Sequence, residues 1–167
     1  LYSGAPGTGG FSDVKRGDWY APYVAFAKRY GIANGYLDGT FRPEQPVSRA
    51  ELVKLIASYF TVEGGTSPFP DVPDGHWAAE VVSFAAEEGW VSGYPDGTFR
   101  PDAPVSRAEA VKILNHALDR RAGERAAALP FTDVEKGHWA CDEIREAAVS
   151  HIYRKSGEGE TWLTYER

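Results

Sequence analysis

A long polar string occurs twice in this chain, and this internal repeat constrains the fold more than any other feature. GYLDGTFRPEQPVSRAE covers residues 35–51, and GYPDGTFRPDAPVSRAE covers residues 93–109. A second string occurs three times: FSDVKRGDW begins at Phe11, FPDVPDGHW at Phe69 and FTDVEKGHW at Phe131. The offsets are 69 − 11 = 58 and 131 − 69 = 62 residues. Repeats of this length indicate small units that bury their apolar faces against their neighbours.

Each unit begins with a predicted helix. Apolar side chains follow Trp19, Trp77 and Trp139 at a spacing that keeps them on one side of a helix. A turn-rich DGTF loop comes next in the first two units, and Pro43 and Pro101 prevent the first helix from continuing through it. The pattern therefore predicts a helix followed by an ordered loop.

A second helix follows the loop in the first two units. Ser48 and Ser106 are N-cap candidates, and Glu51 and Glu109 stand three residues later, which is the spacing of a capping box. An apolar stripe continues behind each of them. We therefore expect an all-α fold of three helix-loop-helix repeats that pack as one pseudo-threefold, or pseudotrimeric, body.

The third unit departs from this pattern. After its first helix it reads RKSGEGETWLTYER, with no counterpart of the FRP or SRAE strings. It is either truncated or a divergent repeat whose aromatic end, Trp162 and Tyr165, docks on the core. The predicted boundaries are a flexible lead-in at residues 1–10 and repeats at residues 11–64, 65–125 and 126–167.

Composition excludes several classes of function. The net charge of −6 argues against a nucleic-acid or anionic-membrane partner, because there is no basic excess to release counterions. Cys141 is the only cysteine, so neither a disulfide framework nor a cysteine-based metal site is expected. The four histidines lack metal-site spacing, no apolar run is long enough for membrane insertion, and no catalytic fingerprint appears. We expect a protein that is not an enzyme and has neither cofactor nor metal.

Folding alone does not explain one repeated residue. Arg49 and Arg107 fall at about the first position of their helices, where the helix dipole disfavours a cation by roughly 0.3–1 kcal/mol. An anionic ligand shared between the guanidinium and the free backbone N–H groups would account for this choice. The alternative is that Arg49 pairs with Glu44 or another carboxylate and only decorates the surface.

Two further residue types recur at equivalent positions, and each has two interpretations. A tryptophan opens the first helix of every unit: Trp19, Trp77 and Trp139. It is either a core residue or a half-exposed ring on which a sugar stacks. An aspartate precedes a valine in every unit: Asp13, Asp71 and Asp133. It either caps a turn or accepts hydrogen bonds from ligand hydroxyls.

The composite pattern F-x-D-V-x-x-G-H-W-A, followed by G-Y-x-D-G-T-F-R-P-x-x-x-V-S-R-A-E, closely resembles the S-layer homology repeat of bacterial cell-surface proteins. The resemblance covers nearly the whole chain after Gly10. It implies an extracellular module in the cell wall or surface layer. Such a module is held non-covalently by a secondary cell-wall polysaccharide, often one with pyruvylated N-acetylmannosamine, in grooves between neighbouring repeats.

The resemblance also implies roles for particular residues. In that family the arginine of a Thr-Arg-Ala-Glu motif meets the acidic group of the sugar, and this role carries onto Arg49 and Arg107. Groove-lining roles carry onto Ser48, Ser106, Glu51, Glu109, Trp19, Trp77, Trp139, Asp13, Asp71 and Asp133. Because the third unit lacks the motif, we expect no more than two functional grooves.

Two functions therefore compete. The leading hypothesis is a carbohydrate-binding anchor whose partner is the cell-wall polysaccharide. The alternative is a protein-interaction or self-assembly module, active in a surface layer, that has kept the fold and lost glycan binding. The divergent third unit and the acidic net charge favour the alternative.

Overall fold

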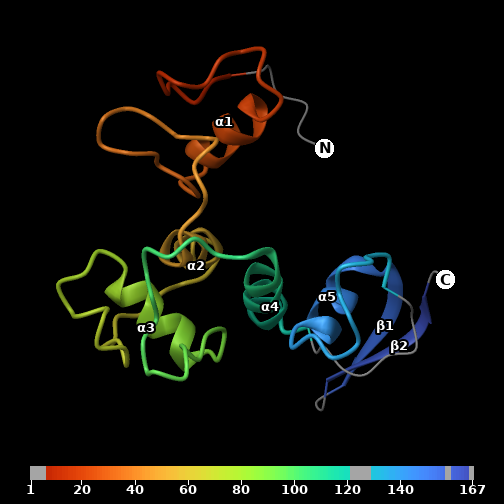
Figure 1. Cartoon of the computed structure of the whole chain (residues 1–167). Coiled ribbons are helices and arrows are strands. Elements are labelled where there is room, and N and C mark those ends of the chain that lie inside the picture. The colour runs from red at the N-terminus through yellow and green to blue at the C-terminus, as the bar shows by residue number, and fades with distance from the viewer. Residues whose placement is uncertain (1–6, 121–128, 157–158, 166–167) are drawn as a thin grey trace.

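The computed structural model describes residues 7–120, 129–156 and 159–165, and this part of the chain is mostly helical (Figure 1). The first repeat contributes α1 (Ala21–Arg29) and α2 (Arg49–Ala57), and the second contributes α3 (Ala79–Glu87) and α4 (Arg107–Ala117). The third contributes α5 (Cys141–Ala148) and the antiparallel strands β1 (His151–Ser156) and β2 (Gly159–Tyr165). The helix-loop-helix prediction is confirmed for the first two repeats.

The all-α expectation is wrong at the end of the chain. The last residues form a hairpin that pairs His151 with Tyr165, and an irregularity between Ile152 and Tyr153 shifts the register. The physical reason is local, since this segment has neither the capping box nor the apolar stripe that starts α2 and α4. The indole N–H of Trp162 donates to Glu146 of α5 at 3.0 Å, which attaches the hairpin to the helix of its own unit. The side chain of Tyr165 lies outside the described residues.

The main core lies between the first two repeats. Val53 of α2, Val82 of α3, Ile113 of α4 and Phe99 of the intervening loop are all buried in one cluster. Each second helix packs on the first helix of the next unit, α2 on α3 and α4 on α5. The packing therefore runs from one repeat into the next.

The first unit stands apart from this core. Phe11, Val14, Ala21 and Val24 form a separate small cluster around α1. Among the described residues α1 contacts no other helix, and Figure 1 shows it on the far side of α2 from α3. The expected closed pseudo-threefold body is therefore not what the described residues show. The repeat pattern would place a second helix after α5, and the chain has a hairpin at that point of the sequence instead.

The predicted repeat boundaries remain predictions. Most of the predicted lead-in, residues 1–6, lies outside the described part of the chain.

Candidate functional site

The DGTFRP loop of each repeat is held by the aspartate at the start of the same repeat. Asp71 accepts hydrogen bonds from the backbone N–H groups of Phe99 at 2.9 Å and Arg100 at 2.7 Å. Asp13 accepts the two equivalent bonds at 2.8 and 2.7 Å. The bond from the Phe41 backbone is the main cause that lowers the pKa of Asp13 below its ordinary value. Both carboxylate oxygens of Asp13 and of Asp71 thus hold the loop of their own repeat in place. Asp133 is exposed, and the third unit has no equivalent loop for it to bind.

A second arginine of each loop escaped the sequence analysis. Arg100 adopts a φ of 59°, stacks its guanidinium 4.1 Å from the ring centre of Tyr94, and donates to Asp96 at 2.8 Å. Arg42 lies 4.0 Å from the ring centre of Tyr36 in the same arrangement. The signal that could have identified these arginines is the FRP string, which is identical in both repeats.

The predicted capping boxes are both present. Ser48 and Ser106 cap α2 and α4, and Glu51 and Glu109 complete the reciprocal hydrogen bonds. Each glutamate also accepts a tyrosine hydroxyl from its own repeat, at 2.5 Å from Tyr94 to Glu109 and at 2.6 Å in the first repeat. Burial raises the pKa of Glu109, but the bonds from Tyr94 and Ser106 outweigh it, so the pKa is lowered. Most of the hydrogen-bonding capacity of these carboxylates is therefore used within the repeat.

Arg49 lies inside the junction between the first two repeats. Its guanidinium carbon is 5.1 Å from the ring centre of Tyr94 and 5.0 Å from that of Phe99. Its Nη1 atom is 3.5 Å from Glu109 Oε1, and this is the only polar contact of the side chain among the described residues. The residue is 7% exposed, and its Nε is buried without a hydrogen-bond partner. Because a guanidinium carries five N–H donors, this cation is poorly satisfied.

The N-terminal end of α2 is closed by the second repeat. The backbone N–H groups of Arg49 and Ala50 donate to the carbonyls of Ala103 at 2.9 Å and Pro101 at 3.0 Å. The expectation that free backbone N–H groups surround Arg49 is therefore wrong. Carbonyls of the neighbouring repeat already satisfy them, which sequence inspection could not reveal.

Arg107 has the opposite environment. It is exposed, and within the described residues neither its guanidinium nor its backbone N–H has a partner. The cause is the third unit, which lacks the FRP segment that would cover the start of α4 as residues 101–105 cover the start of α2. One of the two predicted ligand arginines is thus enclosed, and the other is open.

The three repeated tryptophans are exposed, so the core interpretation is wrong for them. Trp77 is 52% exposed, and the Lys54 ammonium of the preceding repeat lies 5.1 Å from its ring centre. Lys112 lies 5.9 Å from the ring centre of Trp139 in the same way. Trp19 is 80% exposed. The lysines at equivalent positions 54 and 112 are a further part of each junction that the sequence analysis missed.

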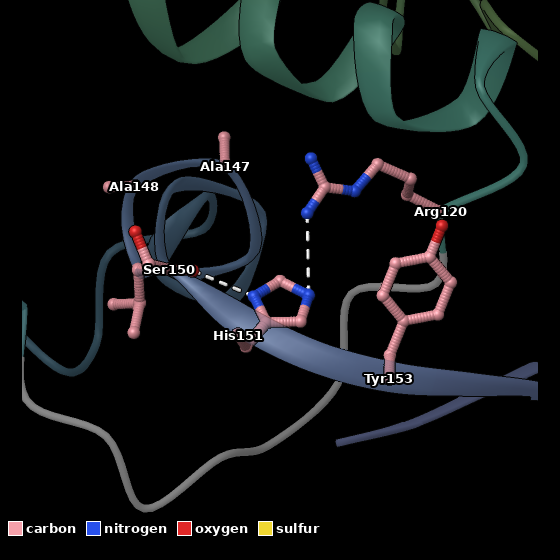
Figure 2. Close-up of a pocket in the computed structure, with 7 residues that line it drawn as sticks. Arg120, Ala147, Ala148, Ser150, His151 and Tyr153 are labelled. Carbon is pink, nitrogen blue, oxygen red and sulfur yellow. Dashed lines mark hydrogen bonds between the residues drawn. The ribbon is translucent and has the colours of Figure 1, made fainter. Parts of the chain in front are cut away.

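An open hollow of about 330 Å³ lies away from these residues, in the third unit. Figure 2 shows Arg120 and the ring of His151 facing each other beside it, with Nη2 and Nε2 3.4 Å apart. Both also contact the buried carboxylate of Glu146, at 2.9 and 3.1 Å. None of the predicted site residues lines this hollow, so the sequence-predicted site is elsewhere, at the junctions.

Comparison with known families decides what these repeats are. The model of the S-layer homology domain matches residues 10–53 and 68–111, which together are more than half of the chain. The chain belongs to the S-layer homology family. The matched spans are the two repeats that carry the capping boxes and the arginines of the VSRAE motif.

Several curated proteins are similar to this S-layer homology chain. The cellulosome-anchoring protein of Acetivibrio thermocellus is 35% identical over 90% of the chain. Cell surface glycoprotein 1 of the same organism is 34% identical over 96% of the chain, and an S-layer protein of Bacillus licheniformis is 40% identical over 64%. The matched regions are only 35%, 7% and 13% of those proteins. These relatives are consistent with the cell surface as the location of this chain.

Two further properties bear on the S-layer homology assignment. No helix in the described residues is long and apolar enough to cross a membrane. In the same part of the chain, no group of three or more histidine, cysteine, aspartate or glutamate side chains could hold a metal ion.

Proposed function

We propose that this S-layer homology chain anchors a surface protein to the bacterial cell wall. It does so by binding an acidic secondary cell-wall polysaccharide, in which a pyruvylated sugar supplies the anionic group. The contacts lie at the junctions between repeats, and Arg49 and Arg107 provide the cations. The proposal assigns binding, and no catalysis, to the chain.

The incomplete hydrogen bonding of the buried Arg49 guanidinium is the main observation behind the proposal. Within the described part of the chain this guanidinium has one polar contact, at 3.5 Å, and a buried Nε without a partner. Since Glu109 is already bonded to Tyr94 and Ser106, moving Arg49 away from it leaves no unpaired carboxylate. A sugar carboxylate that forms a two-point pair with Arg49 gains stronger hydrogen bonds than those it replaces.

The rest of the junction supports a sugar ligand. The exposed face of Trp77, with Lys54 beside it, offers a flat ring and a cation close together. Aromatic rings of this kind bind partners that have an apolar face and a polar edge. The open Arg107 at the start of α4, where backbone N–H groups have no partner among the residues that the structure describes, provides a second anion contact.

Calorimetry with polysaccharide released from purified cell walls tests the proposal. We expect Arg49→Ala and Arg107→Ala each to weaken binding by about 1.5–3 kcal/mol, the contribution of one charge-assisted contact. Arg154→Ala is the matched control, because Arg154 is an exposed arginine on β1 outside the junctions. Unchanged affinity in the Arg49→Ala/Arg107→Ala double variant would overturn the proposal.

A second candidate is a self-assembly module without glycan binding. It is favoured by α1, which contacts no other helix in the described residues and so leaves the first repeat with an uncovered face. This candidate requires oligomers that grow with protein concentration and no sedimentation with purified walls. Sedimentation velocity and a cell-wall pull-down separate the two functions.

A further inference from the structure

An aromatic face runs along the helix of the first repeat. Trp19, Tyr23, Phe26 and Tyr30 follow one another at spacings of four, three and four residues, which is the spacing of one side of a helix. Tyr23 and Phe26 lie in α1, Trp19 lies in the turn before it, and Tyr30 is its C-terminal cap. Three of them, here called the α1 aromatic face, are exposed: Trp19 by 80%, Tyr23 by 63% and Tyr30 by 60%. Phe26 is half-buried, with its ring centre 4.5 Å from that of Tyr30. Rings this exposed contribute little to the core of their own repeat.

The two tyrosines of this face are peculiar to the first repeat, whereas Trp19 recurs as Trp77. The second-repeat residues equivalent to Tyr23 and Tyr30 are Val81 of α3 and Glu88 at its C-terminal cap, and Val81 packs against the core that α2 and α3 share. A helix packed on α1 as closely as α2 packs on α3 would meet a tyrosine ring where α3 has a valine side chain. The substitutions therefore disfavour a helix as the partner of the α1 aromatic face.

The chemistry of the face fits sugar rings. Tyrosine and tryptophan combine a rigid apolar surface with a polar tip, which suits a pyranose with apolar C–H faces and a hydroxyl rim. The twelve residues from Trp19 to Tyr30 comprise α1 and the turn residues at its two ends, and the nine helical residues alone extend about 13 Å, long enough for more than one sugar ring. The ring centres of Trp19 and Tyr23 are 6.5 Å apart and steeply inclined, so they present different surfaces to a bound chain.

The charges beside the face indicate an acidic glycan. Lys15 and Arg16 precede it, and at its other end the guanidinium carbon of Arg29 lies 5.8 Å from the ring centre of Tyr30, so cations stand at both ends of the stripe in a chain of net charge −6. Lys15 and Arg16 are exposed, and within the described part their side chains have no partner. An anionic polymer that follows the helix would meet rings in the middle and cations at each end.

We propose that the α1 aromatic face is a second glycan-binding site, which stacks sugar rings of the wall polysaccharide and is separate from the arginine junctions. The inference rests on the proposed function for the identity of the glycan. It adds Tyr23 and Tyr30 to the glycan contacts and assigns Trp19 to this face rather than to an arginine junction.

The test follows the tryptophan indole N–H signals by NMR while the 167-residue chain is titrated with polysaccharide released from purified walls. A Trp19→Phe variant identifies the Trp19 signal among the five tryptophans. We expect this signal to shift on titration, and the Tyr23→Ser/Tyr30→Ser double variant to show a Kd raised roughly tenfold, equivalent to about 1.4 kcal/mol. Tyr59→Ser is the matched control, because Tyr59 is 70% exposed but lies outside the face.

The outcomes separate this inference from the junction proposal. If the double arginine variant keeps its affinity while the double tyrosine variant loses it, the junction proposal fails and the aromatic site stands. If the Trp19 signal stays fixed and the double tyrosine variant binds as the parent does, the aromatic site is overturned. It is also overturned if the tyrosine changes abolish self-association in sedimentation velocity and leave glycan affinity unchanged, because the face then binds a second copy.

Discussion

The guanidinium of Arg49 in the first repeat lies 3.5 Å from the carboxylate of Glu109 in the second. These residues are sixty positions apart, and each stands in the capping segment of its own helix. Glu109 has better partners, because Tyr94 and Ser106 hold it at shorter distances. The contact therefore joins the two repeats, and the carboxylate of Glu109 does not depend on Arg49 for its hydrogen bonds.

The two motif arginines are expected to differ in their effect on stability. Arg49→Ala removes a buried side chain that packs on Tyr94 and Phe99, so the free energy of unfolding should fall by about 1–3 kcal/mol. Arg107→Ala removes an exposed side chain without partners in the described residues, so its effect should stay within about 0.5 kcal/mol. Urea unfolding of both variants checks this, and equal losses would contradict the enclosed position of Arg49.

Tyr94→Phe tests the hydrogen bond that holds Glu109. The hydroxyl of Tyr94 lowers the pKa of Glu109, so its removal should raise that pKa in the folded protein. The stability that this depressed pKa contributes is present above the unfolded value and is lost as the pH falls through the folded one. The variant should therefore lose stability at neutral pH, by about 1.5–3 kcal/mol, and lose less on acidification. Carboxyl NMR titration and urea unfolding at two pH values measure both effects.

Tyr36→Phe is the internal comparison for that experiment. It removes the equivalent bond to Glu51, whose pKa is likewise lowered by the tyrosine against the effect of burial. The pKa of Glu51 should rise while that of Glu109 stays where it is. A shift of both carboxyls in either variant would show that the change is not local.

Acid should weaken the DGTF loops. Hydrogen bonds from Thr40 first, and then Arg42, lower the pKa of Asp38 from 3.8 to about 2. Because the folded pKa lies below the unfolded one, this stabilisation is complete above about pH 4 and is lost as the pH falls toward 2. Asp38→Asn should remove that part of the acid dependence, as measured by thermal unfolding between pH 5 and 2. An unchanged pH profile in the variant would refute the role of this carboxylate.

Sequence reasoning succeeded where the determining contacts are local. The capping box of Ser48 and Glu51 spans three residues, so its chemistry is complete within the string itself. The state of Arg49 could not be predicted in this way, because its neighbours Tyr94, Phe99 and Glu109 come from another repeat. Arg49 and Arg107 stand in identical VSRAE motifs but have opposite environments. The FRP loop of the second repeat covers Arg49, whereas the third unit has no such loop to cover Arg107.

The tryptophans illustrate a second limit. Trp19, Trp77 and Trp139 occupy an apolar position of an amphipathic pattern, which is usually buried. Whether such a ring is covered depends on the preceding repeat, which places a lysine over Trp77 and over Trp139 and leaves both rings exposed. Periodicity predicts which side of a helix is apolar, but it does not say what packs against that side.

The last prediction concerns the buried carboxylate that fastens the hairpin. Glu146 is 1% exposed and accepts hydrogen bonds from Arg120 at 2.9 Å and from the indole of Trp162 at 3.0 Å. Glu146→Ala leaves Arg120 without this carboxylate in a partly buried position, and breaking a buried pair of this kind typically costs about 3–5 kcal/mol. We expect the cost to appear locally, as faster amide hydrogen exchange in β1 and β2 with little change in α2 and α3. The exposed Glu135→Ala is the control. Uniform loss of protection in all helices would instead mean that the hairpin and the repeats unfold as one unit.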